Sequence, residues 1–140
     1  FGERKIHPTA GITAIGARMP LVAFNVNLAT SDVNIAKKIA KVIRGSSGGF
    51  RSCKAMGFML EDRGIAQVSM NMVNYEDTPL YVVYEMIKAL AERYGTYVVD
   101  SEIVGLTPGK ALIDCAEYYL KAKDFDCHNQ VMEYHIIEME

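Results

Sequence analysis

The chain has 140 residues and a mass of 15.6 kDa, and 50% of its residues are apolar, which suffices for the core of one ordinary domain. Nine Lys or Arg and two acidic residues fall in positions 1–60, against six Lys or Arg and fifteen acidic residues in positions 61–140. Much of the basic excess lies on one predicted helix, with Phe50 as the only aromatic residue among its charges, which argues against nucleic-acid binding. The basic residues remain compatible with the binding of a small polyanionic substrate.

The sequence contains no apolar run near 18 residues and no basic-then-apolar leader, so we expect neither a membrane span nor a signal peptide. The chain begins at Phe1, which we interpret as an internal cut. The three cysteines, Cys53, Cys115 and Cys127, are odd in number and form no CxxC pair. We therefore expect inert, reduced thiols and a cytoplasmic location.

The first half of the chain predicts a strand, a helix and a hairpin. Apolar and polar residues alternate over residues 21–28, which is typical of a half-buried strand. The helix that follows should begin at Thr30 or Ser31 and end at Gly45. Residues 53–60 and 65–73 predict two strands of an antiparallel hairpin, joined by a short turn.

The second half predicts a helix, a strand and further helices. Thr78-Pro79 is a helix-start signal, and apolar residues recur at helical spacing from Leu80 to Tyr94. Residues 97–104 predict a fourth strand. Thr107-Pro108 repeats the start signal before a third helix, and the last dozen residues favour helix slightly.

The order strand, helix, strand, strand, helix, strand is the split βαβ pattern. It predicts an α+β fold, a ferredoxin-like βαββαβ sandwich with an antiparallel sheet and C-terminal helical additions. We expect residues 1–19 to be a linker from a missing N-terminal subdomain and residues 20–140 to be the domain. In this topology the first and third strands are central, and both helices cover one face of the sheet. The other face, which we call the open face, carries no helix.

Strand alternation predicts which side chains point to the open face. Asn is poorly suited to strands, and amides both donate and accept hydrogen bonds, so an uncharged amide cluster can bind heterocycle edges or carboxylates under a covering layer. The alternative is an ordinary solvated or partner-covered face. Arg18, just before the first strand, is our first choice for an anion contact. The residues predicted to face outward, which we call the floor residues, are Asn25, Asn27, Gln67, Ser69 and Asn71.

The common catalytic signatures are missing from the sequence. The histidines lie at no metal-ligand spacing, so we expect no metal site, and no nucleophile motif is present. His7 is a lone loop histidine that we expect to be structural or exposed. Asp100 and Glu102, on the probable edge strand, are a weak candidate for a carboxylate pair that converges on the floor.

A resemblance to one family is carried by three stretches: GAR followed closely by LVAFNVNL, then GFMLEDRGIAQVSMNMVNYEDTPL, then VGLTPGKALID. They resemble the C-terminal subdomain of glutamate formiminotransferase, which also forms the first catalytic unit of formiminotransferase-cyclodeaminase. The similarity covers roughly residues 1–120. Met19-Pro20 departs from the Lys-Phe pair expected in animal members, which suggests a microbial form.

The resemblance implies two ferredoxin-like subdomains packed through their sheets, with folate and N-formimino-L-glutamate in a tunnel between them. It implies a cytoplasmic enzyme of histidine degradation that moves the formimino group to N5 of tetrahydrofolate, the acceptor, without a metal. The family's general-base histidine belongs to the N-terminal subdomain, so we expect no catalytic residue in this chain and no activity of the chain alone. The residues that carry over to binding are Gly16, Arg18, Asn25, Asn27, Gln67, Ser69 and Asn71.

Several alternatives remain at this point. The chain could be a stand-alone ferredoxin-like module that binds a ligand or assembles through the same face, without catalysis. A relative that moves formyl instead of formimino groups would use the same folate nitrogen. The expected partners are the missing subdomain and the two substrates, with neither nucleic acid nor membrane, and a homodimer is compatible with the sequence.

Overall fold

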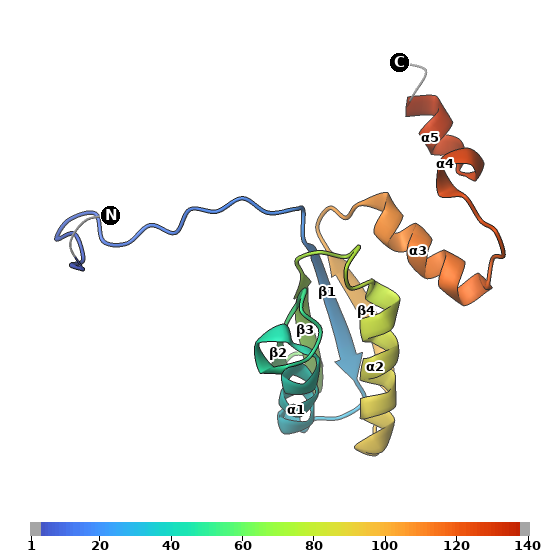
Figure 1. Cartoon of the computed structure of the whole chain (residues 1–140). Helices are drawn as coiled ribbons and strands as arrows, with labels where there is room; N and C mark the ends of the chain where they lie inside the picture. Colours follow the sequence, from blue (N-terminus) through green and yellow to red (C-terminus); the bar gives the residue numbers. More distant parts are fainter. Residues whose placement is uncertain (1–3, 138–140) are drawn as a thin grey trace.

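The four strands and the first three helices form where the periodicity of the sequence predicts them, and two further short helices form within residues 127–137, where the sequence favours helix only slightly. The computed structural model describes residues 4–137, and Figure 1 shows their arrangement. The elements are β1 (Val22–Leu28), α1 (Val33–Ile43), a 3-10 turn (Gly45–Ser47), β2 (Cys53–Leu60), β3 (Ile65–Met72), α2 (Leu80–Arg93), β4 (Val98–Val104), α3 (Gly109–Leu120), α4 (Cys127–Gln130) and α5 (Met132–Ile137).

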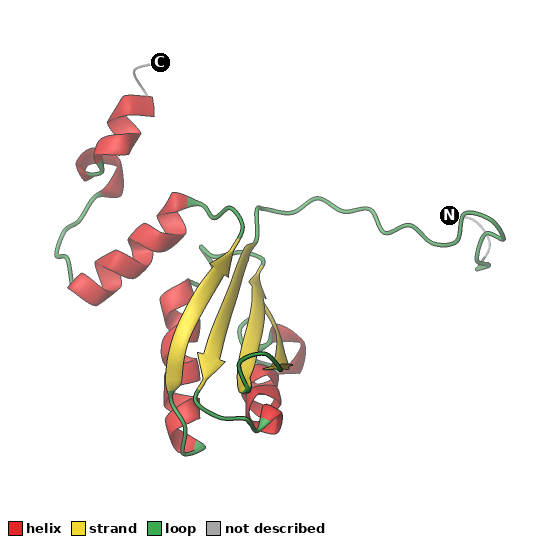
Figure 2. Ribbon diagram, turned by 180° about the vertical axis from the view of Figure 1, so that it is seen from behind, coloured by secondary structure: helices red, strands yellow, loops and turns green. Residues whose placement is uncertain are grey.

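The strands form one antiparallel sheet in the order β2-β3-β1-β4. The first and third strands are therefore the central pair, and the predicted ferredoxin-like class is confirmed. Helices α1 and α2 cover one face of the sheet (Figure 1). Figure 2 shows the opposite face, where the strands lie in front of these helices and no helix covers them.

The core lies between the sheet and the two covering helices. Its strand residues are the alternating apolar positions of the two central strands, since Val22, Val26, Ala66 and Val68 are all fully buried. Helix α1 adds Ile39 and Ile43, and α2 adds Val83 and Ile87. Because successive side chains of a strand point to opposite faces, burying these positions turns their neighbours toward the open face.

The helix starts differ from the predicted caps. Asp32, not Thr30 or Ser31, caps α1, because its carboxylate accepts a hydrogen bond from the Asn34 backbone N–H at 2.9 Å. The Thr30 hydroxyl instead accepts from the Asp32 backbone N–H. Helices α2 and α3 begin after Pro79 and Pro108 without a side-chain cap, so the preceding threonines do not cap them.

The two ends of the described chain leave the sheet in different directions (Figure 1). Residues 12–21 run as an extended segment, and before them a turn at residues 8–10 is closed by a bridge between His7 and Gly11. Helices α3, α4 and α5 follow β4, so the helical additions are confirmed within the described residues. None of the helices in residues 4–137 is both long and apolar enough to span a bilayer.

Candidate binding site on the open sheet face

The strand register arranges the floor residues in rows across the open face. One row runs Phe58, Gln67, Asn27, Asp100 from β2 to β4, and the next runs Met56, Ser69, Asn25, Glu102. A third row places Lys54 opposite Asn71. All five predicted floor residues therefore point to the open face. The rows also bring Asp100 and Glu102 onto it, so the expectation of an uncharged face is wrong.

A hydrogen-bond network joins the central amides to the two carboxylates. Gln67 Nε2 donates to Asn27 Oδ1 at 2.9 Å and to Glu102 Oε1 at 3.0 Å. Asn25 Nδ2 donates to the same Glu102 oxygen at 3.0 Å, and Asn27 Nδ2 donates to Asp100 Oδ1. Asn27 and Gln67 are buried, at 1% and 5% exposure. The network therefore fixes the middle of the face before any ligand binds.

An ion pair closes the network at the β4 edge. Arg63, in the β2–β3 turn, donates to Asp100 Oδ2 at 2.7 Å. The hydrogen bonds from Arg63 and from Asn27 stabilise the charged form and lower the pKa of Asp100 below its ordinary value. Asp100 and Glu102 thus do converge on the floor, through different partners: Arg63 balances Asp100, whereas Glu102 is held by two neutral amides.

The opposite edge of the face is basic. A hollow of about 600 Å³ beside β2 is lined by Ser69 and Asn71 from the floor and by Met56 and Phe58 from β2. Its cations are Arg44, Arg51 and Lys54. Strand alternation alone predicts that Lys54 lies on the same face as Asn71, whereas Arg44, which directly follows α1, reaches this hollow only through the fold. The open face is therefore acidic at β4 and basic at β2.

The structure does not bring the other two predicted binding residues to the floor. Gly16 and Arg18 lie in the extended segment before β1, and both are exposed. The Arg18 guanidinium donates to the neighbouring Met19 carbonyl at 3.4 Å, and no other hydrogen bond of its side chain occurs within residues 4–137. Their role in binding stays a prediction.

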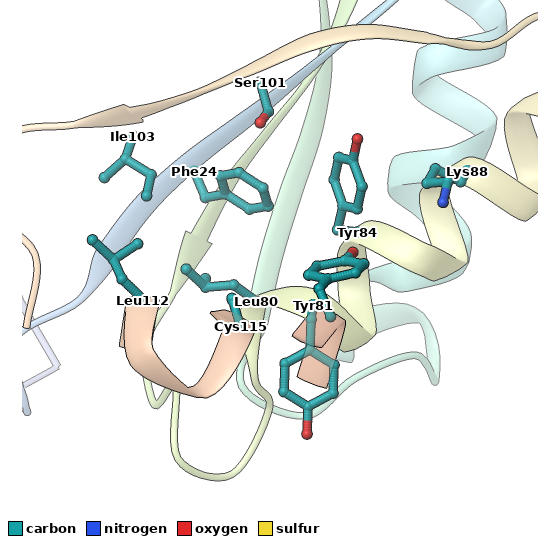
Figure 3. Close-up of a pocket in the computed structure, with 10 residues that line it drawn as sticks. Phe24, Leu80, Tyr81, Tyr84, Lys88, Ser101, Ile103, Leu112 and Cys115 are labelled. Atoms are coloured by element: carbon teal, nitrogen blue, oxygen red, sulfur yellow. The ribbon is translucent and has the colours of Figure 1, made fainter. Parts of the chain in front are cut away.

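A second hollow of about 450 Å³ lies on the helix-covered side of the sheet, between β4, α2 and α3 (Figure 3). Ser101 and Ile103 point into it, because they alternate along β4 with Asp100 and Glu102. Aromatic and apolar side chains dominate its lining, and its Lys88 amine is paired with Glu85 at 3.0 Å. The floor residues lie on the other side of the sheet and take no part in it.

The remaining candidates for a catalytic group within the described residues are a metal site, His7 and the cysteine thiols. No group of three His, Cys, Asp or Glu gathers among residues 4–137 in a way that could hold a metal ion. His7 is exposed, and its Nδ1 accepts from the Ala10 backbone N–H at 3.1 Å. Burial raises the pKa of the Cys53 thiol to about 11, which keeps it protonated and inert at neutral pH.

Comparison with known proteins decides the family. The sequence profile of the formiminotransferase domain matches residues 23–139, most of the chain. The chain belongs to this family. It is 65% identical over 137 residues to the glutamate formimidoyltransferase of Streptococcus pyogenes serotype M1, covering 98% of the chain and 46% of that protein. The predicted resemblance is confirmed.

More distant relatives carry the same domain. The glutamate formimidoyltransferase of Thermoplasma acidophilum is 51% identical over 117 residues, which are 84% of the chain and 39% of that protein. The formimidoyltransferase-cyclodeaminase of Gallus gallus is 41% identical over 126 residues, which are 86% of the chain and 23% of that protein. The chain therefore spans less than half the length of these relatives.

Proposed function

We propose that the chain is the C-terminal half of a folate-dependent transferase that moves the formimino group from N-formimino-L-glutamate to N5 of tetrahydrofolate in histidine degradation. Family membership and the names of the relatives support a formimidoyltransferase. The observation that carries the finer proposal is the open face: its amides are ordered in a network, and no helix among the described residues covers it. A polar face of this kind suits one wall of a binding tunnel.

The other wall in this proposal is the N-terminal subdomain, in the region of the relatives that this chain does not span. It would pack across the open face and exclude water from the floor, which strengthens hydrogen bonds to a ligand. Exposed apolar side chains at the β2 edge, Met56 at 61% and Phe58 at 44% exposure, provide area for that contact.

The two edges of the open face suit different parts of the substrates. Both substrates carry glutamate carboxylates, and the hollow with Arg44, Arg51 and Lys54 gathers cations for them beside Ser69 and Asn71. The amides on β1 and the carboxylates on β4 suit the nitrogen-rich groups that react, the formimino group and the pteridine. The residues of this chain thus bind and orient the substrates.

The transfer forms a bond between N5 of tetrahydrofolate and the formimino carbon, through a tetrahedral intermediate. The bond from that carbon to the glutamate nitrogen then breaks. N5 loses a proton and the departing nitrogen gains one, so one residue able to accept and return a proton serves both steps. We place that residue, a histidine, in the N-terminal subdomain, and expect the chain alone to be inactive.

The proposal is tested by changing the floor in the complete enzyme. Asn25→Leu combined with Asn71→Leu should leave the fold intact and weaken both folate binding and formimino transfer. Asn34→Leu, on the exposed surface of α1, is a matched control that should leave both unchanged. Kinetics of the double variant equal to wild type would remove the floor assignment.

The two-wall arrangement has its own test. Titration of the isolated chain with 5-formyltetrahydrofolate should give much weaker binding than titration of the complete enzyme, because one wall is missing. Equal affinity would show that this chain forms the pocket by itself, as the alternative of a stand-alone ligand-binding module requires.

A further inference from the structure

Three hydrogen-bond acceptors on the residues that meet at Glu102 lack a donor within the described part of the chain. They are Oδ1 of Asn25, Oε1 of Gln67 and Oε2 of Glu102, which we call the acceptor triad. The partner atoms of the same groups are all engaged: Asn25 Nδ2 and Gln67 Nε2 both donate to Glu102 Oε1. Gln67 also donates to Asn27, so both of its N–H bonds are used.

The orientation of these amides follows from the two carboxylates. An ionised carboxylate only accepts hydrogen bonds, so Asn25 and Gln67 must turn their nitrogens toward Glu102. Asp100 likewise requires the Asn27 nitrogen, which leaves Asn27 Oδ1 to accept from Gln67. Both ends of the network therefore force the free oxygens of Asn25 and Gln67 away from the carboxylates. A flipped amide would place two acceptors against each other.

The acceptor triad also carries an unbalanced negative charge. Arg63 forms an ion pair with Asp100, whereas Glu102 has no ion-pair partner within residues 4–137. Gln67 is only 5% exposed and still has one oxygen without a donor. The oxygen itself is not fully buried, because the fully buried side-chain polar atoms without a partner within residues 4–137 are Oγ1 of Thr96 and Oγ1 of Thr107. A ligand on the open face can therefore reach it and donate to it.

We propose that the acceptor triad binds a planar N–C–N group whose N–H donors point at Asn25, Gln67 and Glu102. This inference rests on the proposed function, which supplies two such groups. The formimino group of N-formimino-L-glutamate is an amidine, which is protonated and cationic at neutral pH. The pteridine of tetrahydrofolate presents a neutral 2-amino group beside a ring N–H. Each of these two groups presents several N–H donors in one plane, with no acceptor between the donors.

The test uses the complete enzyme and the variant Glu102→Gln. The new amide keeps one oxygen for Asn25 and Gln67 and turns a nitrogen toward the ligand, so an acceptor becomes a donor and the charge is lost. Equilibrium binding is measured with N-formimino-L-glutamate, with its oxygen analogue N-formyl-L-glutamate, and with 5-formyltetrahydrofolate. Glu92→Gln, an exposed residue on α2, is the matched control. Glu102→Asp keeps the charge and should give an intermediate loss.

Two results support the inference and identify the ligand group. A roughly 10- to 100-fold weaker affinity for N-formimino-L-glutamate, with N-formyl-L-glutamate and the folate unchanged, assigns the triad to the amidinium. The same loss for the folate alone assigns it to the pteridine edge. In both cases Glu92→Gln should bind like wild type, and the unfolding midpoint of Glu102→Gln should stay close to it.

Other results count against it. Glu102→Gln that binds all three compounds as wild type does overturns the inference while leaving the proposed function in place. An enzyme whose wild-type form neither binds these compounds nor transfers the formimino group overturns the proposed function, and the inference with it.

Discussion

Gln67 on β3 donates a hydrogen bond to Glu102 on β4, with Nε2 and Oε1 3.0 Å apart, although β1 lies between the two strands. The Gln67 side chain crosses the floor over Asn27 and contacts it on the way, at 2.9 Å. One buried amide thus joins three strands on the open face. Its position explains why this face is ordered without a helix to cover it.

The first prediction concerns this amide and stability. Gln67→Leu removes the donor of both hydrogen bonds and leaves Asn27 Oδ1 without a partner in a buried place. We expect the free energy of unfolding to fall by about 1–3 kcal/mol. Chemical denaturation measures the change. Asn71→Leu, exposed on the same strand, should change it by less than about 0.5 kcal/mol, and similar losses in both variants would contradict the role of the network.

The second prediction concerns the contact between β2 and α1. A Cβ added at Gly57 would lie 2.4 Å from the Lys37 backbone nitrogen and 2.6 Å from the Ala36 carbonyl carbon. Gly57→Ala should therefore push the helix away and lower the free energy of unfolding by about 1–3 kcal/mol.

Gly109 provides the control for this change. It lies in the first turn of α3, and a Cβ there would meet nothing within 4 Å. Gly109→Ala should leave stability unchanged or raise it slightly, since Ala favours helix. A thermal midpoint for Gly57→Ala at or above that of Gly109→Ala would show that α1 does not need this close approach.

The third prediction is a pH dependence at the β4 edge. Hydrogen bonds from Arg63 and Asn27 lower the pKa of Asp100, so its charged form stabilises the folded state above its unfolded pKa of about 3.9. This contribution is lost as the pH falls through the folded pKa. Asp100→Asn should have a lower unfolding midpoint than wild type at pH 7, and the difference should shrink below pH ~4. A difference that grows on acidification would contradict the assignment.

The fourth prediction concerns the basic hollow. Arg51→Ala with Lys54→Ala should weaken binding of 5-formyltetrahydrofolate to the complete enzyme, roughly three- to tenfold at low salt, because exposed charge contacts each contribute up to about 1 kcal/mol. The loss should diminish at high salt as screening increases. Lys37→Ala with Lys41→Ala removes the same charge from the exposed face of α1. Equal losses in the two double variants would indicate a general charge effect without a site.

The sequence predicted the fold because its apolar periodicity is clear. Val22, Val26, Ala66 and Val68 mark the buried sides of the central strands, and that pattern also placed all five floor residues correctly. The prediction of a side-chain cap was wrong at Thr78, which is buried and does not cap α2. A proline just before the helix supplies its start without a side-chain hydrogen bond.

The charged part of the open face was harder to predict. The sequence offers Asp100 and Glu102 as a candidate pair on the floor but does not predict their partners, because the register of β4 shifts at a bulge beside Asn27 and no sequence pattern sets that register. Arg63 reaches Asp100 from a turn 37 positions earlier in the chain. Arg18 was expected at the floor from its closeness in sequence to β1, but its extended segment makes no hydrogen bond to the sheet among the described residues.

The central claim is that ligand binds on the open face and not in the hollow on the helix side. Hydrogen–deuterium exchange of the complete enzyme, with and without 5-formyltetrahydrofolate, tests it most directly. Ligand should slow exchange in β1 and β3 around Asn25, Gln67 and Ser69, and leave α2 around Tyr84 and α3 around Leu112 unchanged. Protection confined to α2 and α3, which line the second hollow in Figure 3, would contradict the claim.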